Sequence, residues 1–215
     1  MSPNTPYLVG VTGGLGSGKS TVCRFLAEKG CRLFEADQVA RELQLHDQEV
    51  IAAIKALFGA GVYSIDSAGT LSLDRKQVAA AVFSSSEKLQ ALNQLMHPKV
   101  FEEFQNVVLD AAAKGDKLLL KEAAILLESG GAKGLDAIVV VTAGLAERVE
   151  RAIQKGMGSR EEIMQRIAQQ WPEERLIERA DYVVENKGSL EELKEACNAL
   201  YQKLLQAASS PRNHL

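Results

Sequence analysis

A glycine-rich stretch near the start of the chain constrains the fold more than any other feature. Residues 13–20 read Gly-Gly-Leu-Gly-Ser-Gly-Lys-Ser and match the phosphate-loop pattern G-x-x-x-x-G-K-[ST]. An apolar run at residues 7–11 precedes the stretch and predicts a strand, and Val22, Phe25 and Leu26 follow at helical spacing. A strand, a glycine loop and a helix in this order are the context that such a loop requires. We therefore expect a nucleotide-binding α/β domain.

The residue types of the loop suit the binding of a triphosphate. Backbone N–H groups must wrap the phosphates, and glycine permits the necessary curvature and close approach. Lys19 would bring a positive charge to the β- and γ-phosphates, and Ser20 would place its hydroxyl on Mg²⁺. The expected ATP-binding residues are Gly14, Gly16, Ser17, Gly18, Lys19, Ser20 and Thr21. The alternative is a glycine-rich turn with a surface lysine, and the loop alone does not separate a kinase from a GTPase or a motor ATPase.

The composition is ordinary for a soluble globular protein, with 215 residues, 46% hydrophobic and 25% charged. A net charge of −3 gives no reason to expect nucleic acid or an acidic membrane as a partner. Cys23, Cys31 and Cys197 form no C-x-x-C pair, which favours reduced thiols in a cytoplasmic protein. Residues 1–6 are short and polar, so we expect no signal peptide. No run approaches the ~18 apolar residues of a membrane helix.

Short apolar runs alternate with helical patterns along the chain, which predicts an α/β P-loop kinase fold with a parallel sheet and helices on both faces. The five expected strands are residues 7–11, 31–34, 117–122, 136–142 and 181–185. We expect one domain with a core at residues 7–46, 116–143 and 180–208, a helical insertion at 47–115, a lid at 144–179 and a disordered polar tail at 209–215.

The insertion is almost entirely helical in pattern, with a Gly/Ser-rich break at residues 59–70. Asp74 and Ser84 each resemble a helix N-cap, with Gln77 and Glu87 three residues later. His97 precedes Pro98 and predicts a further helix start, because proline suits the first helical position. We expect this insertion to bind the second substrate.

Two carboxylates, Glu35 and Asp37, follow the second expected strand at alternate positions. Both would lie on one side of the backbone if the strand continued through them. Carboxyl ends of strands are where α/β sheets bind ligands, so Asp37 is a candidate catalytic residue. Asp37 also begins a helical pattern, and a role as helix N-cap is an equal alternative.

Arg148, Arg151 and Lys155 are spaced three and four residues apart, so a helix would align them on one face. The alternative is a solvated helix with internal ion pairs, such as Glu147 with Arg151. Beside a phosphate loop, an arginine-bearing hairpin would neutralise charge on the transferring phosphoryl group and exclude water.

Other classes of P-loop protein fit less well. A GTPase would carry Asn-Lys-x-Asp, but residues 186–189 read Asn-Lys-Gly-Ser, with Ser189 in place of the aspartate. A motor ATPase would show more strands and a longer chain. Length, insertion and arginine lid together favour a small P-loop kinase.

Several motifs are similar to those of the dephospho-CoA kinase family across residues 7–205. The first is Val-Thr-Gly-Gly-Leu-Gly-Ser-Gly-Lys-Ser-Thr at residues 11–21, and the second is Glu-Ala-Asp-Gln-Val-Ala-Arg at residues 35–41, which resembles D-A-D-x-[IV]-A-R. Further matches are Asp-Arg at 74–75, His-Pro at 97–98, Leu-Leu-Glu at 126–128, Ala-Asp-Tyr-Val-Val at 180–184 and Asn186.

The resemblance implies phosphorylation of the ribose 3′-hydroxyl of dephospho-CoA by ATP with Mg²⁺, the last step of coenzyme A synthesis. It assigns Asp37, Lys19 and Arg151 to catalysis, and Ser20 and Asp37 to the metal. Arg148 and Asn186 join the ATP-binding residues. The residues expected to bind the acceptor are Glu35, Arg41, Arg75, His97, Lys99 and Glu128.

The chain departs from the family pattern at three places. Glu35 replaces an aspartate, Glu-Ala-Ala-Ile at 122–125 replaces D-[IV]-P-L, and Lys155 stands at the second lid arginine. Lysine lacks the bidentate fork of arginine, so we expect Arg151 to carry the catalytic charge of the lid. Another small-molecule or nucleoside monophosphate kinase, or a P-loop regulatory protein without transfer activity, are the alternatives. The oligomeric state does not follow from the sequence.

Overall fold

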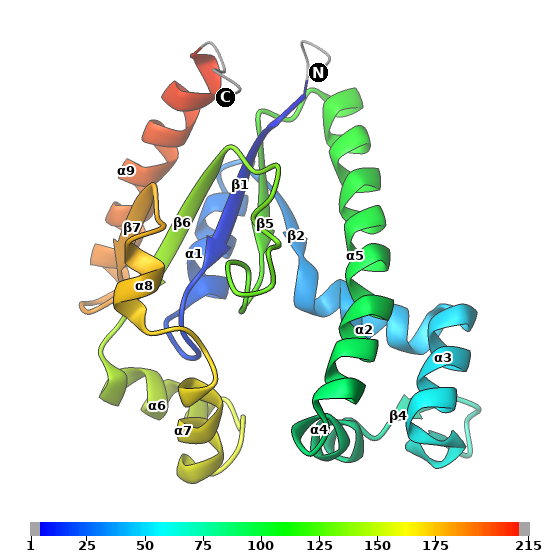
Figure 1. The fold of residues 1–215 in the computed structure, drawn as a ribbon. Coiled ribbons are helices and arrows are strands. Elements are labelled where there is room, and N and C mark those ends of the chain that lie inside the picture. Colours follow the sequence, from blue (N-terminus) through cyan, green and yellow to red (C-terminus); the bar gives the residue numbers. More distant parts are fainter. Residues whose placement is uncertain (1–4, 211–215) are drawn as a thin grey trace. The chain divides into compact units, whose positions relative to one another are not determined.

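A five-stranded parallel sheet forms the centre of the fold in a computed structural model, which describes residues 5–210 (Figure 1). Its strands, in chain order, are β1 (Tyr7–Thr12), β2 (Arg32–Glu35), β5 (Leu118–Glu122), β6 (Ala137–Thr142) and β7 (Tyr182–Glu185). Their order in the sheet is β2-β5-β1-β6-β7. All five strands therefore form where the sequence predicts them, and β1, which leads into the phosphate loop, lies in the middle.

Both faces of the sheet are covered, which explains why its strands are continuous apolar runs. Helices α1 (Lys19–Ala27) and α9 (Leu190–Ser209) pack together, and their buried side chains join those of β1, β5 and β6 in one core. On the opposite face, Gly10 of β1 leaves room for larger neighbours. A Cβ atom at Gly10 would lie 2.8 Å from Leu135 Cδ1 and 2.9 Å from Ile138 Cδ1.

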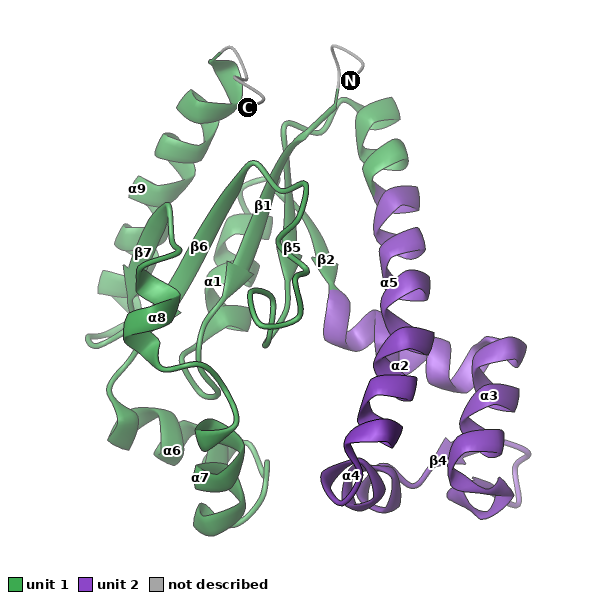
Figure 2. Cartoon of the chain, viewed as in Figure 1, with its two compact units in different colours: residues 1–35, 108–215 green, residues 36–107 purple. Residues whose placement is uncertain are grey.

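The chain divides into two compact units, which are described separately (Figure 2). Unit 1 comprises residues 1–35 and 108–215 and contains the parallel sheet, and unit 2 comprises residues 36–107. Unit 1 also holds three shorter helices between β6 and β7, namely α6 (Leu145–Gln154), α7 (Arg160–Ala168) and α8 (Glu173–Ile177). These three helices occupy the range expected for the lid.

Unit 2 is built from helices around a small core of its own. Its helices are α2 (Ala36–His46), α3 (Gln48–Phe58), α4 (Arg75–Phe83) and the first part of α5 (Ser86–Lys114), with a short 3₁₀ turn, η1 (Ala60–Val62). Buried residues from these segments meet in one cluster that includes Val50, Ile54, Val78 and Met96.

The Gly/Ser-rich break that we expect to interrupt the helices contains strands. β3 (Tyr63–Ile65) and β4 (Leu71–Leu73) form an antiparallel hairpin. Asp66 organises its turn, because its carboxylate accepts hydrogen bonds from the N–H groups of Ala68 and Thr70, each at 2.9 Å. The packing of Tyr63 in the unit 2 core gives the hairpin its anchor.

The helix starts of unit 2 are predicted correctly at Asp74 and wrongly at two other places. The Asp74 carboxylate accepts from Gln77 N–H at 2.9 Å and caps α4. At the next helix, Lys88 N–H donates to Ser85 Oγ at 3.3 Å, so the contact involves Ser85 rather than Ser84. The expected start at His97-Pro98 is also wrong, because α5 continues through Pro98. Proline removes one backbone donor there, while Met96 and Phe104 stay buried on either side.

Two capping boxes are confirmed, and both place serine at the helix N-cap with glutamate three residues later. Ser159 and Glu162 begin α7, and Ser189 and Glu192 begin α9. Helix α9 extends through Ser209 into the expected tail, and residues 211–215 of that tail lie outside the described residues, as do residues 1–4 of the polar start. Within residues 5–210, no helix has the length and apolar character needed to cross a membrane.

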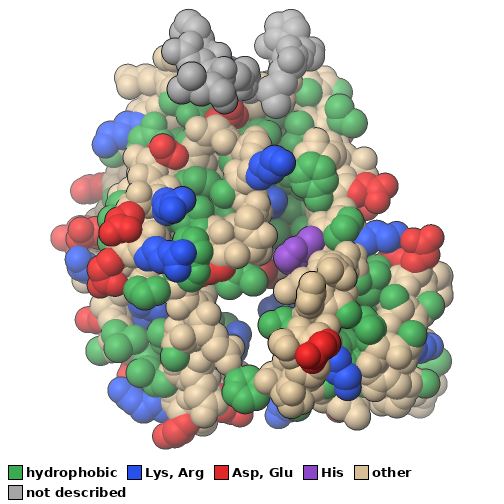
Figure 3. Space-filling model, viewed as in Figure 1, with side chains coloured by type: hydrophobic (Ala, Val, Ile, Leu, Met, Phe, Trp, Pro, Cys, Tyr) green, Lys and Arg blue, Asp and Glu red, His purple; other side chains and the backbone are tan. Residues whose placement is uncertain are grey.

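Lysine and arginine side chains are interspersed with aspartate and glutamate on the face shown in Figure 3. This holds for the surface of each unit in that view. Neighbouring charges of opposite sign cancel over a short distance, so this face carries no broad field of one sign. Any binding of an anion on this face would therefore depend on local groups.

Candidate active site

The phosphate loop connects β1 to α1 and uses glycine where the backbone turns. Gly16 and Gly18 have φ angles of 78° and 98°, in the left-handed region that favours glycine. Gly16 is also crowded, because a Cβ atom there would lie 2.8 Å from the carbonyl carbon of Arg148 and closer still to its oxygen. The loop therefore rests directly on the backbone of α6.

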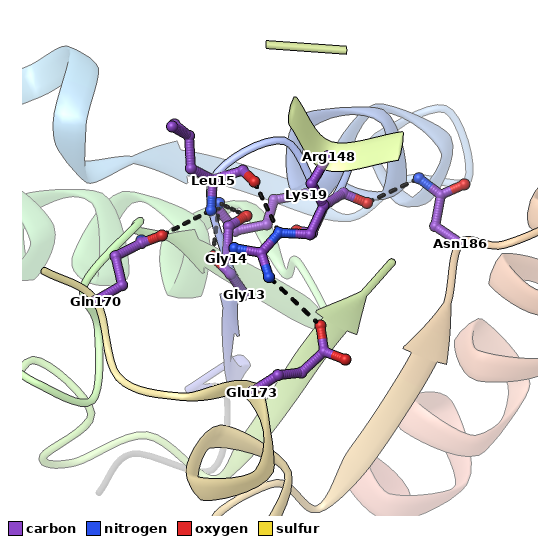
Figure 4. A network of polar contacts seen from close by, with 9 residues as sticks. Gly13, Gly14, Leu15, Lys19, Arg148, Gln170, Glu173 and Asn186 are labelled. Atoms are coloured by element: carbon purple, nitrogen blue, oxygen red, sulfur yellow. Dashed lines mark hydrogen bonds and ion pairs between the residues drawn. The ribbon is translucent and has the colours of Figure 1, made fainter. Parts of the chain in front are cut away.

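Lys19 lies on the inner side of the loop that the sequence identifies (Figure 4). Its ammonium donates hydrogen bonds to the carbonyl oxygens of Gly13 at 2.9 Å and Gly14 at 3.3 Å, and the residue is only 8% exposed. Lys19 also begins α1, whose first N–H groups and positive dipole end face the same loop. Loop, ammonium and helix N-terminus together offer the groups that an anion site needs.

Arg148 supports the loop from the side of α6. Its Nε donates to the Leu15 carbonyl oxygen at 2.9 Å, and its Nη1 lies 3.8 Å from Glu173 Oε2 (Figure 4). Burial lowers the pKa of Arg148, and the charge of Glu173 opposes this shift. Arg148 is 8% exposed. The guanidinium that the sequence places on the surface of a lid helix is therefore buried, and it holds the phosphate loop.

Arg151 and Asn186 form a second link to the loop. Asn186 Nδ2 donates to the Ser17 carbonyl oxygen at 2.8 Å, and Arg151 Nη2 donates to the Asn186 carbonyl oxygen at 3.2 Å. Arg151 Nη1 is buried and has no hydrogen-bond partner among the described residues. The structure thus brings Asn186, a predicted ATP-binding residue, into contact both with Ser17 of the loop and with the expected catalytic arginine.

Carboxylates end two neighbouring strands of unit 1. Glu35 of β2 and Glu122 of β5 are partners in the strand register, and Glu122 also pairs with Val11 at the entrance to the loop. Burial raises the pKa of Cys23 well above its ordinary value, and the charges of Glu122 and Glu35 raise it further. The thiol one turn after Lys19 therefore stays protonated at neutral pH.

Two predicted loop residues remain accessible at the start of α1. Ser20 is exposed and Thr21 is half-buried. A hydroxyl there, together with carboxylates, offers the oxygen ligands that Mg²⁺ prefers. In residues 5–210 no group of three or more His, Cys, Asp or Glu side chains could hold a metal ion by itself. Kinase sites do not need such a group, because their Mg²⁺ keeps waters and binds substrate phosphates.

Three residues of unit 1 contact the site without being recognised as a group in the sequence. Gln170 Oε1 accepts from Leu15 N–H at 2.7 Å, and its Nε2 donates to the Ala124 carbonyl oxygen at 3.0 Å. Glu173 pairs with Arg148. Glu128, an expected acceptor ligand, accepts from Trp171 N–H at 3.2 Å through Oε1, while its Oε2 is buried with no partner in the described part of the chain. No local pattern marks Gln170, because its partners are distant in sequence.

The other expected acceptor ligands lie in unit 2, together with Asp37. Asp37 is exposed in the first turn of α2, one residue inside the helix that begins at Ala36, so it is not the N-cap. Arg41, Arg75 and His97 are exposed. Partial burial lowers the pKa of Arg75, the charge of Arg41 lowers it further, and the charge of Glu42 opposes the shift.

Lys99 of unit 2 has carboxylate partners in the structure. Its ammonium lies 3.0 Å from Asp47 and 2.6 Å from Glu49. Hydrogen bonds to Glu49 and Asp47 raise the pKa of Lys99. Binding a phosphate would require Lys99 to give up this ion-pair geometry, and its assignment to the acceptor stays a prediction.

A parallel sheet whose central strand enters a glycine loop with a buried lysine defines a P-loop nucleotide-binding protein. The family model for dephospho-CoA kinase matches residues 7–192. The chain belongs to the dephospho-CoA kinase family.

Similar proteins match nearly the whole chain. Dephospho-CoA kinase from Chlorobium luteolum is 53% identical over 210 residues, covering 98% of this chain and 96% of the relative. The enzyme of that name from Chlorobium chlorochromatii is 56% identical over 208 residues, covering 97% and 98%.

Solved structures share the fold. A crystal structure of a Thermus thermophilus protein has a TM-score of 0.75 at 34% identity, covering 93% of this chain and 98% of that one. The structure of dephospho-CoA kinase from Campylobacter jejuni has a TM-score of 0.67 at 21% identity, with 94% and 98% covered.

Proposed function

We propose that the chain transfers the γ-phosphoryl group of ATP to the ribose 3′-hydroxyl of dephospho-CoA, giving coenzyme A and ADP. As a member of its family, the chain is a phosphotransferase acting in coenzyme A biosynthesis. The observation that carries the donor side is the buried Lys19 ammonium, which donates to the carbonyl oxygens of Gly13 and Gly14 within the loop. A β,γ-phosphate would offer it a charged partner in their place.

On the donor side, the loop binds ATP through its backbone N–H groups and the N-terminus of α1. Asn186 holds the Ser17 carbonyl and thereby the part of the loop next to Gly18. Arg151 supplies the lid's positive charge, and its buried Nη1 has a donor to offer. In phosphoryl transfer such an arginine neutralises charge that builds up on the transferring group.

By the family resemblance, Ser20 and Asp37 would supply oxygen ligands to Mg²⁺, and both residues are exposed. Bound Mg²⁺ would screen the charge of the β- and γ-phosphates. A loose transition state needs positioning more than a strong base, so the task of Asp37 is to accept a hydrogen bond from the acceptor hydroxyl and orient it.

On the acceptor side, we assign the diphosphate of dephospho-CoA to Arg41 and Arg75. The charge of Arg41 lowers the pKa of Arg75, and an anion bound by both side chains would offset that repulsion. Glu35, His97 and Glu128 are the further residues that we assign to the acceptor, and Glu128 Oε2 is a buried acceptor that a substrate hydroxyl would satisfy. We place the enzyme in the cytoplasm, because all three cysteines are free, buried thiols.

An acceptor panel tests the proposal. ADP formation would be measured with dephospho-CoA, with nucleoside monophosphates and with small alcohols, and only dephospho-CoA should support turnover. Asp37→Asn should lower turnover about a hundredfold or more while ATP binding is unchanged. Glu102→Gln is the matched control, because Glu102 is an exposed carboxylate of unit 2 that the proposal leaves outside the site. ATP consumption that needs no acceptor would instead indicate a regulatory ATP-binding protein.

A further inference from the structure

The segment of residues 169–173, called the strap here, joins α7 to α8 and contacts three separate parts of unit 1. Gln170 contacts the phosphate loop and the segment after β5, Trp171 contacts Glu128, and Glu173 contacts Arg148 of α6. Figure 4 shows Gln170 and Glu173 reaching the loop region from the same stretch of chain. The strap therefore lies where the loop, α6 and the end of the lid meet.

Leu15 is the loop residue held by this arrangement, and both of its backbone polar groups are taken by side chains. Its N–H donates to Gln170 Oε1 at 2.7 Å, and its carbonyl oxygen accepts from Arg148 Nε at 2.9 Å. Its side chain, 8% exposed, packs with Val149 and Ile163 of the lid helices. A change in the position of the lid would therefore carry Leu15, and with it the loop, along.

The chemistry of Gln170 is specific to its two contacts. Its amide oxygen accepts from Leu15 N–H while its amide nitrogen donates to the Ala124 carbonyl oxygen. A carboxylate can make only the first contact, because it has no proton to donate, and an apolar side chain can make neither. The Gln170 amide makes both contacts at once and so links the loop to the segment after β5.

We propose that Gln170 is a positioning residue for ATP, which holds the phosphate loop at Leu15 in the shape that binds the nucleotide. It acts through Leu15 and Ala124 and does not touch the reacting atoms. Because the shape of the loop matters equally before and during transfer, loss of Gln170 should weaken ATP binding and leave the chemical step nearly unchanged.

The decisive variant is Gln170→Met, which keeps the approximate length and removes both hydrogen bonds. We expect KM for ATP to rise about tenfold, with kcat within twofold of wild type, since one or two lost hydrogen bonds correspond to about that factor. Gln170→Glu keeps the contact with Leu15 and should raise KM for ATP about threefold. Gln169→Met is the matched control, because Gln169 is the exposed neighbour at the end of α7 and should leave both constants unchanged.

A second measurement needs no acceptor and no turnover. Trp171 is the single tryptophan of the chain, and it lies on the strap with the Arg175 guanidinium 3.5 Å from its ring centroid. Its fluorescence should change on titration with ADP, and the midpoint should shift about tenfold in Gln170→Met, in line with KM. This readout separates failure of the positioning role from failure of the proposed acceptor chemistry.

The proposal is overturned if Gln170→Met and Gln169→Met share the same KM for ATP and the same fluorescence midpoint. It is also overturned if kcat falls at unchanged KM, since Gln170 would then act on the chemical step. Thermal unfolding of each variant verifies that it is folded. If Gln170→Met does not fold, the threefold rise in Gln170→Glu takes over the test, and an unchanged KM in that variant refutes the role.

Discussion

Replacing Gly16 by alanine should damage the phosphate loop through its contact with α6. The added methyl group would lie 2.8 Å from the Arg148 carbonyl carbon. Carbon atoms in contact are normally about 3.5–4.0 Å apart, so loop and helix must separate by about 1 Å. A misplacement of about 1 Å can cost about a hundredfold in rate, and we expect that loss in kcat/KM for ATP. Positive φ adds about 1–2 kcal/mol of strain.

Gly134→Ala separates these two effects. Gly134 has a φ of 80°, close to the 78° of Gly16, and nothing lies within 4 Å of the place that its Cβ would occupy. A loss of about 1 kcal/mol lowers Tm by about 2–4 °C for a chain of this size, so Gly134→Ala should show a fall of that order and full activity. Gly16→Ala should lose about 5–10 °C together with ATP binding. Equal activity of the two variants in a coupled ADP assay would refute the steric reasoning.

Two further results are expected. Arg151→Ala should lower turnover about a hundredfold or more. Lys155→Ala, at an exposed position just after α6, should have a small effect on turnover. Equal small losses in both variants would contradict the assignment of the catalytic charge to Arg151. The second result concerns pH. Hydrogen bonds from Val50 N–H and from Lys99 lower the pKa of Asp47 below 3.8. The ionised Asp47 therefore stabilises the fold at neutral pH, and this contribution is lost as pH falls below about 4. Asp47→Asn, which can still cap a helix, should have a lower Tm than wild type at pH 7, and the difference should shrink at pH 3. A constant difference would show that the charge is not responsible.

The sheet and the phosphate loop could be predicted because their signals are local. Residues such as Val9, Leu120 and Val139 belong to short apolar runs that only a covered parallel sheet explains, and all three are fully buried. The loop pattern likewise names its own residues. The positions of Lys19 and the loop glycines could therefore be predicted without reference to the rest of the chain.

The features that could not be predicted depend on tertiary contacts. The hairpin around Asp66 has the Ser, Gly and Asp content of a loop, and packing of Tyr63 in the unit 2 core decides its structure. Pro98 resembles a helix start, but buried residues on both sides keep α5 continuous. Arg148 belongs to a sequence pattern typical of a charged surface helix. Its burial results from a tertiary contact with the Leu15 carbonyl, which the sequence alone does not reveal.

The hydrogen bonds that support the phosphate loop also determine when the loop can reach its final structure during translation. Leu15 is separated from Arg148 by 133 positions and from Gln170 by 155, and Ser17 is separated from Asn186 by 169. At about 5–20 residues per second, the last of these partners is made roughly 10–30 s after the loop itself. Strand β1 also cannot pair in the sheet until both of its neighbours, β5 and β6, have been translated, because both come later in the chain. The segment translated first is therefore completed last, and a growing chain gains its full nucleotide site only when Asn186, directly after the final strand, has left the ribosome.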